Sequence, residues 1–302
     1  MPVTFSLLDV FADVPFQGTQ IPVVETDDAL SEDMRTAIAG EFRQTETVFV
    51  NRKDIEHPFS VYNHRGPVAF GAHTILAASF VAEKTGLTHD EGSFSVLRLQ
   101  DEMQQIESFI DKTVQGADSI QYKCLLRPTL DAYTPELSRI AQALQVEEKH
   151  FTYSRYKPLL VSVDHPILIV PLTKPEHILA ANLVKAQWAS LLSDIYASEI
   201  LLFSPGSISG MTDFHGRLIN PYLAQDDYPP IGSAVPEFIA YLAQLPETAE
   251  GTHTFSIDRG SLNTRKSVIH AEFDKRKGKE TQCRIGGRVI KVGEGRLLVP
   301  LT

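Results

Sequence analysis

Two helical stretches that are apolar on every side constrain the fold of this chain more than any other feature. Residues 70–82 read FGAHTILAASFVA, and residues 231–243 read IGSAVPEFIAYLA. A surface helix keeps a polar face, whereas a helix that is hydrophobic all round has to be buried on all sides. Each stretch therefore predicts a central helix that other elements surround.

The rest of the sequence repeats one order of elements around these two helices. In each half, short runs with strand-like alternation come with a surface helix, and the apolar helix follows. Because a sheet wrapped around its own helix would bury it fully, we predict an α+β (mixed α/β) fold of two repeated barrel-like halves. Each half is an antiparallel-rich sheet around its central helix. We expect one domain over 1–119, with a strand near 296–302 as a candidate to complete it, and a second over 120–295; the length of 302 residues favours two domains.

Capping signals give the expected bounds of the helices. Ser31 is an N-cap candidate for a helix over 31–42, and Gly86 ends a helix over 72–86. Further helices are predicted over 135–144, 175–195 and 232–245. The glycine pair in RIGGRV (284–289) suits a hairpin turn.

Composition excludes several classes of protein. The net charge of −10 argues against binding to nucleic acid or to an anionic membrane surface. The sequence has no apolar run of about 18 residues, no signal peptide at its start, and no GxGxxG or P-loop motif. The only cysteines, Cys124 and Cys283, show no metal-ligand spacing, so we expect neither a disulfide framework nor a zinc site. A reducing, cytoplasmic setting fits this composition.

Glu46 is the first candidate for chemistry. In TETVFV (45–50) a period of two places Glu46 on one face with Val48 and Val50. If the valines face the core, desolvation would raise the pKa of Glu46 toward the range of a general acid or base. The alternative is a glutamate that guards a sheet edge and faces water, and spacing alone favours this alternative.

The first turns of the apolar helices are candidate anion sites. Free N–H groups and the positive end of the helix dipole gather around His73, although a buried histidine is often only a core residue. Gly232, Ser233 and Ala234 open the second helix in the same way. Ser233 could contact an anion, but simple N-capping explains it equally well, and it lacks the GxSxG context of a nucleophile.

Five stretches together resemble the PhzF-like (phenazine-biosynthesis) isomerases, which share the diaminopimelate epimerase fold. Residues 8–24 are similar to the family opening D-x-F-(T/A)-x-x-P-F-x-G-N-P-x-A-V-V, and residues 41–50 to E-F-N-x-S-E-T-V-F. Residues 70–78 resemble C-G-H-A-T-L-A-A when aligned on His73. Residues 216–234 resemble R-x-F-x-P followed by E-D-P-x-T-G-S-A, and residues 259–267 a Q-G-x-x-x-G-R-P-S stretch. The matches keep their order along nearly the whole chain.

The resemblance implies an active site between two halves that needs no cofactor and no metal. Members of the family typically move a proton by acid/base chemistry in a small amino-acid-like or cyclic carboxylic acid, and they are commonly homodimers. Glu46 takes the position of the catalytic carboxylate. The substrate-contacting positions carried over are Gly18, Thr19, Gly71, Ala72, His73, Thr74, Ile231, Gly232 and Ser233.

Several positions depart from the family pattern. Asp227 and Tyr228 stand where the family has Glu-Asp, and Ile231 replaces its threonine. Tyr228 could donate a hydrogen bond, act as an acid, or only fill space; we carry Tyr228 and Asp227 as catalytic candidates beside Glu46. Gly71 falls where the epimerase branch has a catalytic thiol, so racemisation by two thiols is excluded if the alignment holds.

These observations leave three functional hypotheses. The first is an isomerase or tautomerase in which Glu46 shuttles a proton. The second is a retooled cyclase or dehydratase of specialised metabolism, suggested by the more apolar set at Tyr228 and Ile231. The third is a non-catalytic small-molecule-binding protein, which a solvent-facing Glu46 would favour.

Overall fold

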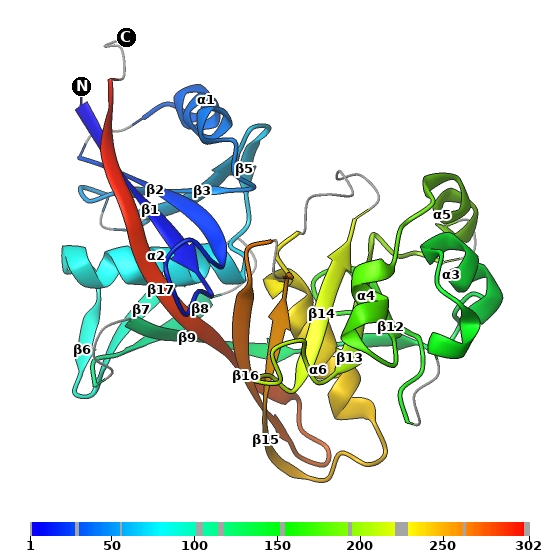
Figure 1. Cartoon of the computed structure of the whole chain (residues 1–302). Coiled ribbons are helices and arrows are strands. Elements are labelled where there is room, and N and C mark those ends of the chain that lie inside the picture. The colour runs from blue at the N-terminus through cyan, green and yellow to red at the C-terminus, as the bar shows by residue number, and fades with distance from the viewer. Residues whose placement is uncertain are drawn as a thin grey trace. The chain divides into compact units, whose positions relative to one another are not determined.

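The computed structural model describes residues 2–27, 30–54, 56–100, 105–113, 118–151, 155–192, 195–220, 229–261 and 264–298. The chain forms two compact units (Figure 1). Unit 1 consists of Met1–Lys123 and Ile285–Thr302, and unit 2 of Cys124–Arg284. The chain leaves unit 1 in β9 (Asp118–Leu126) and returns to it in β17 (Thr281–Leu298). Division into independently folding domains at residues 119/120 and near 296 stays a prediction.

The sheet of unit 1 is built from both ends of the chain. β17 pairs with β1 on one side and with β9 on the other, so it joins two groups of strands. One group runs β1-β2-β3-β4-β5 and the other β9-β8-β7-β6. Neighbouring strands within these groups are antiparallel except β2 and β3, which are parallel. The strands are β1 (Pro2–Val10), β2 (Thr19–Thr26), β3 (Thr47–Asn51), β4 (Phe59–Asn63), β5 (Gly66–Val68), β6 (His89–Glu91), β7 (Phe94–Gln100) and β8 (Gln105–Asp111).

The first apolar helix is central to unit 1, as predicted. α2 (Ala72–Thr85) packs against β1, β2 and β3 and also against β7 and β8, and Figure 1 shows it between these groups of strands. Every residue from Ala72 to Ala82 is buried. Gly86 ends the helix with φ +74°, a left-handed backbone that glycine adopts without steric cost.

The predicted surface helix of unit 1 is also present. α1 (Glu32–Phe42) begins after Ser31, whose Oγ accepts the Met34 N–H at 3.2 Å. The helix buries Ile38 and Ala39 in a cluster with Phe49 and Tyr62. It therefore covers β3, β4 and β5.

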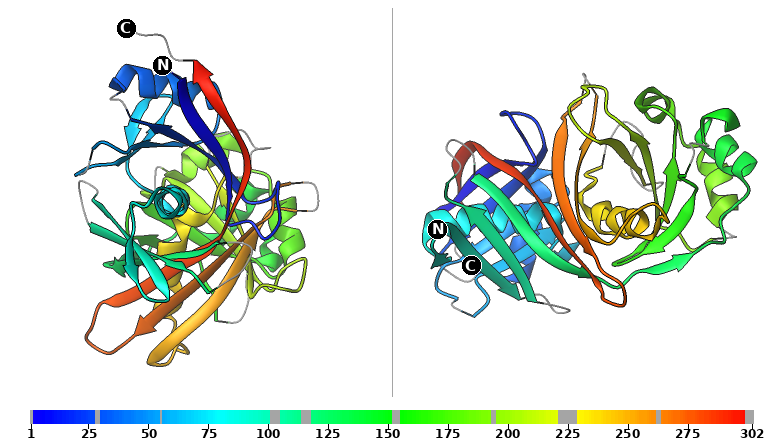
Figure 2. Two further views of the ribbon diagram at one scale, coloured as in Figure 1. Left: turned by 90° about the vertical axis from the view of Figure 1, so that its left-hand side faces the viewer. Right: turned by 90° about the horizontal axis from the view of Figure 1, so that it is seen from below.

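The strands of unit 2 surround the second apolar helix. These strands are β10 (Thr129–Asp131), β11 (Leu159–Ser162), β12 (Pro166–Pro171), β13 (Glu199–Pro205), β14 (Phe214–Ile219), β15 (Gly251–Arg259) and β16 (Ser267–Lys275). They pair in chain order, and only β12–β13 and β14–β15 are parallel. α6 (Val235–Gln244) lies within the curve of these strands (Figure 2, right), and its residues Val235 to Ala243 are all buried. Both predicted central helices are thus confirmed.

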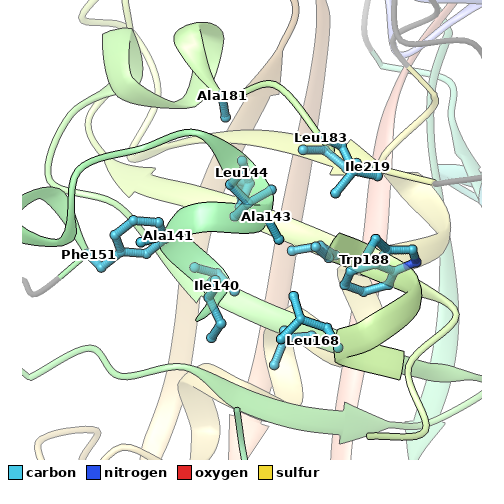
Figure 3. Close-up of a cluster of buried hydrophobic side chains, with 14 of the residues drawn as sticks. Ile140, Ala141, Ala143, Leu144, Phe151, Leu168, Ala181, Leu183, Trp188 and Ile219 are labelled. Carbon is cyan, nitrogen blue, oxygen red and sulfur yellow. The ribbon is translucent and has the colours of Figure 1, made fainter. Parts of the chain in front are cut away.

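Three short helices cover the other face of this sheet. α3 (Leu137–Leu144), α4 (Pro175–Ala180) and α5 (Lys185–Leu192) pack on it through a cluster that includes Ile140, Leu168 and Trp188 (Figure 3). A short 3₁₀ turn, η1 (Glu148–His150), follows α3. The prediction of one helix over 175–195 is wrong. The chain breaks after α4 because the N–H groups of Asn182 and Val184 bond to carbonyls at the end of α3 instead of continuing the helix.

The glycine pair in RIGGRV does not form a hairpin turn, which corrects the prediction. β17 continues straight through Gly286 as one strand of 18 residues. A Cβ on Gly286 would lie 2.5 Å from the Ile120 carbonyl oxygen and 2.7 Å from the Gln121 Cβ. The glycine is needed because β9 approaches the backbone of β17 closely here.

The two cysteines form a disulfide, so the expectation that none is present was wrong. Cys124 and Cys283 are 159 residues apart in sequence, but their Cα atoms lie 5.3 Å apart. Cys124 is the first residue of unit 2 and Cys283 the last but one, so the bond links the two ends of the chain segment that forms this unit. The spacing of the two cysteines in the sequence could not predict this bond, because β9 and β17 are far apart in the chain and become neighbours only in the folded protein. Among the described residues, no helix is long and apolar enough to cross a membrane.

Candidate functional site

The first turn of α2 presents His73 at one end of unit 1. Gly71 is the N-cap, and Thr74 closes the turn: its Oγ1 accepts the Gly71 N–H at 2.9 Å and donates to the Gly71 carbonyl at 3.0 Å. The N–H groups of Ala72, His73 and Thr74 cannot pair inside the helix and carry its positive dipole end. The helix therefore begins where the sequence predicts, and an anion site at this end stays a prediction.

The loop between β1 and β2 lies beside the first turn of α2. The buried His73 ring packs edge-on against Phe11, with ring centroids 5.0 Å apart and planes at 88°. Phe11 follows the last residue of β1, and that residue, Val10, pairs with Thr19 at the start of β2. Gly18 and Thr19 therefore lie near the first turn of α2.

Glu46 stands at the start of β3, beside this group. β3 runs parallel to β2 with Val23 opposite Val48, so continuing the register by two residues places Glu46 beside Ile21. β3 also pairs with β4, so it is an interior strand and the edge-strand alternative is wrong. Glu46 is only partly exposed, and burial raises the pKa of its carboxyl group to about 7. A group with this pKa can both take up and release a proton near neutral pH.

A substitution at Gly18 should disturb this end of the unit. Gly18 has φ +70°, and an added Cβ would clash with the Val10 carbonyl oxygen and lie 2.9 Å from the Ala12 Cβ. We expect Gly18→Ala to lower the free energy of unfolding by about 2 kcal/mol or more, measured by denaturant titration. Gly40→Ala is the control, because Gly40 lies in α1 with only an ordinary contact at 3.9 Å. Equal stability of the two variants would contradict the steric argument.

The start of α6 differs from the prediction. Gly232, Ser233 and Ala234 form a 3₁₀ turn, η2 (Gly232–Ala234), and the α-helix begins only at Val235 with Ala234 as its N-cap. Ser233 does not cap the helix through its side chain, which is exposed. Pro236 in the first helical turn explains the later start, because proline is favoured there and donates no N–H. Ile231, immediately before the turn, is buried.

The structure thus brings the predicted site residues together within each unit. Asp227 and Tyr228 lie outside the described residues. The set of unit 1 comprises Gly18, Thr19, Glu46, Gly71, Ala72, His73 and Thr74. The set of unit 2 comprises Ile231, Gly232 and Ser233.

Sequence reasoning missed three residues that shape the first set, Asp9, Phe11 and Phe16. The buried Asp9 carboxylate accepts the Phe16 N–H at 2.6 Å, and this bond spans the loop that leads to Gly18. Phe11 and Phe16 both have a left-handed backbone, with φ +58° and +66°, which costs energy for a residue that is not glycine. The loop is therefore held in a strained conformation beside His73. The D-x-F stretch formed by Asp9, Val10 and Phe11 was the sequence signal that could have indicated this loop.

A fourth missed residue, Glu237, is the only charged residue in the second apolar stretch. Its Oε1 accepts the N–H groups of Val163, Asp164 and His165 at 3.1–3.4 Å. Burial raises the pKa of Glu237, and a hydrogen bond from His165 to Glu199 at 3.1 Å raises the pKa of His165. This cluster attaches α6 to the turn between β11 and β12. In the described part of the chain, no group of three or more His, Cys, Asp or Glu side chains is placed to hold a metal ion.

Residues 8–295 match the model of a family described as phenazine biosynthesis-like protein. A mixed α/β fold of this kind, with a wrapped sheet around a central helix in each unit, is the fold of the PhzF proteins and of related epimerases. The chain belongs to the phenazine biosynthesis-like (PhzF) family.

Individual relatives are distant in sequence but cover nearly the whole chain. An uncharacterized isomerase of Mesorhizobium japonicum is 23% identical, with 98% of each chain covered. The crystal structure of a PhzF-family protein of Bacillus anthracis has a TM-score of 0.85 and 17% identity, covering 99% of this chain and all of that one. A predicted epimerase of Pseudomonas aeruginosa has a TM-score of 0.74 and 23% identity, with 98% and 99% covered. The two solved structures show the fold that this chain shares with them.

Proposed function

We propose that the protein is a cofactor-independent isomerase that moves a proton in a small carboxylate-bearing molecule. The observation that carries the proposal is the pKa of Glu46, which burial raises to about 7. A carboxyl group with an ordinary pKa near 4.3 is a weak base, whereas one near 7 is matched to proton transfer at neutral pH. Glu46 takes a proton from the carbon next to the carboxylate or carbonyl group and returns it to a different position or face.

The negative charge that builds up on the substrate needs donors nearby. The N–H groups in the first turn of α2, around the buried His73, supply such donors in unit 1. We propose that Gly232 and Ser233 at the entry to α6 supply further anion-binding groups. Asp227 and Tyr228 complete this proposal as candidates for a second proton donor.

One observation bears on each of two other functions for the same site. The buried Ile231 in place of the family threonine favours the second candidate, a retooled enzyme of the cyclase or dehydratase type, because it makes the site more apolar. A non-catalytic binding protein is less consistent with Glu46, since burying a carboxyl group costs free energy that simple binding does not require.

We also propose a homodimer, and we keep the cytoplasm as the proposed location. The Cys124–Cys283 disulfide bears against this location, because such bonds are rare in proteins of the reducing cytosol. Mass spectrometry after thiol alkylation of the protein isolated from its native host tests this location. Free thiols would agree with the cytoplasm, and an intact disulfide would argue for an oxidising compartment.

Solvent exchange tests the proposed function directly. Small carboxylic acids, among them cyclic acids and amino acids, are incubated with the protein in heavy water over a range of pH. We expect deuterium to enter the carbon next to the carboxylate of one of them, at a rate that rises with pH up to about 7 and then levels off, because Glu46 must be ionised to accept the proton. An exchange rate that does not change with pH across this range would exclude Glu46 as the base.

A further inference from the structure

The start of α6 is held by a carboxylate that solvent does not reach. Glu237 lies in the first turn of this helix, and its side chain is fully buried. One oxygen, Oε1, accepts the N–H groups of three successive residues in the turn between β11 and β12, namely Val163, Asp164 and His165. In the described part of the chain, the other oxygen, Oε2, has no hydrogen-bond partner. A buried carboxylate of this kind is costly unless a positive charge or a proton is close by.

His165 supplies this positive charge when it is protonated. Its Nδ1 lies 3.9 Å from Glu237 Oε1, and its Nε2 is hydrogen-bonded to Glu199 Oε2 at 3.1 Å. The other oxygen of Glu199 accepts the side-chain N–H of Asn220 at 2.8 Å. The imidazole ring therefore lies between two carboxylates, and both favour its protonated form. We call Glu237, His165 and Glu199 the Glu237 cluster.

The Glu237 cluster joins elements that are far apart in the sequence. Glu237 belongs to α6, His165 directly precedes β12, and Glu199 is the first residue of β13. The 3₁₀ turn η2, which carries Gly232 and Ser233, directly precedes α6. A change in the cluster therefore acts at the end of α6 that follows these two candidate residues.

Other charges near the cluster are few. In the described part of the chain, the charge that acts on it from outside is that of the exposed Asp164. β11 and β12 carry no charged residue, and the middle of β16 faces α6 with apolar side chains. Lys275 of β16 bonds to backbone carbonyls at the other end of α6. β15 pairs with the start of β14, so its Arg259 lies away from Asn220 and the cluster.

We propose that the Glu237 cluster is a pH-sensitive switch that holds the start of α6 to the β11–β12 turn while His165 is protonated and loosens this contact when the proton leaves. With the proton, one positive charge lies between two carboxylates. Without it, Glu237 and Glu199 repel each other across a neutral ring. The proton can pass to solvent, because the His165 side chain is 33% exposed. The switch needs neither a substrate nor Glu46, so it is independent of the proposed function.

The direction of the pH effect follows from the pKa of each group. The hydrogen bond to Glu199 raises the pKa of His165 above 6.5, so the folded protein holds this proton more tightly than the unfolded chain. This contribution to stability is full below pH 6.5 and is lost as pH rises through the raised pKa. Burial raises the pKa of Glu237 above 4.5, so its ionisation also costs stability as pH rises above that value. Both groups therefore weaken the contact as pH rises.

Amide hydrogen exchange tests the switch at the residues that form it. The N–H groups of Val163, Asp164 and His165 are followed from about pH 5.5 to about 8.5. Each rate is compared with that of an unstructured peptide at the same pH, which gives a protection factor. We expect protection to fall roughly threefold or more over this range, on the scale of a partly exposed ion pair. Protection at Leu201 and Leu202, buried in the middle of β13, should not follow this fall.

Substitutions assign the effect to the cluster. His165→Gln keeps a side chain that can donate to Glu199 but does not titrate, so protection of the turn should become nearly constant with pH. Glu237→Gln keeps an acceptor for the three N–H groups and removes the charge, and it should also reduce the pH dependence. His270→Gln is the matched control, because His270 is an exposed histidine of the same unit, and it should behave as wild type.

Three results would overturn the proposal. One is wild-type protection of the turn that does not change with pH. Another is the same pH dependence in His165→Gln as in wild type. The third is an equal fall at Leu201 and Leu202, which would mean that the whole unit loses stability and that the contact at α6 does not open by itself.

Discussion

Replacing Glu46 by glutamine is expected to lower the rate of substrate proton exchange about 10²–10⁴-fold, the usual contribution of a positioned acid or base. Glutamine keeps the size and polarity of the side chain but cannot accept a proton. The rate is measured as deuterium incorporation at pH 8, where the wild-type carboxyl group, with its pKa of about 7, is mostly ionised. The residual rate of the variant should no longer depend on pH around 7.

Stability measurements separate this effect from misfolding. The pKa of Glu46 is raised in the folded protein from 4.5 to about 7, so ionisation of this group destabilises the fold as pH rises between these values. Glu46→Gln removes that cost, and the variant should be at least as stable as wild type at pH 8. Glu41→Gln, at an exposed position in α1, is the control and should keep full activity. An inactive Glu46→Gln that is also less stable at pH 8 would contradict the assignment of a buried base.

Removing the disulfide is expected to lower the free energy of unfolding of unit 2 by about 5 kcal/mol. In the chain-entropy model the bond restricts the unfolded chain, and the effect grows with the length of the closed loop, here 159 residues. The measurement compares denaturant unfolding of wild type with that of the Cys124→Ser, Cys283→Ser double variant.

A reductant provides the internal control for this measurement. Dithiothreitol should bring wild type to the stability of the double variant and leave the double variant unchanged, since the bonded pair comprises all the cysteines of the chain. Wild-type protein that already equals the double variant without reductant would mean that the thiols are not joined in solution.

The central helices could be predicted because their sequences leave few alternatives. Residues 72–82 carry no charge and end close to Gly86, and the structure buries all of them. Ser31 and Gly86 marked helix ends correctly because capping depends on residues adjacent in the chain. Predictions that depended on distant partners failed more often. The break between α4 and α5 comes from backbone bonds to α3, and Gly286 is required by the approach of β9, neither of which a local pattern reveals.

At the candidate site, too, features set by local sequence could be predicted, and features set by distant partners could not. Glu46 could be found from the alternation in TETVFV and the family resemblance, but spacing alone favoured an exposed edge, because the partner strands on both sides were unknown. Glu237 carried no motif, and its burial follows only from the way α6 packs within its sheet. Ser233 looked like an N-cap because its residue type fits, but Pro236 moves the helix start beyond it.

The position of β17 has a consequence for how the protein is made. This strand lies between β1 and β9 and is translated after almost all of unit 2. Until β17 is made, the edges of β1 and β9 that it pairs with stay unpaired. A chain cut short before residue 285 therefore leaves those edges open to aggregation.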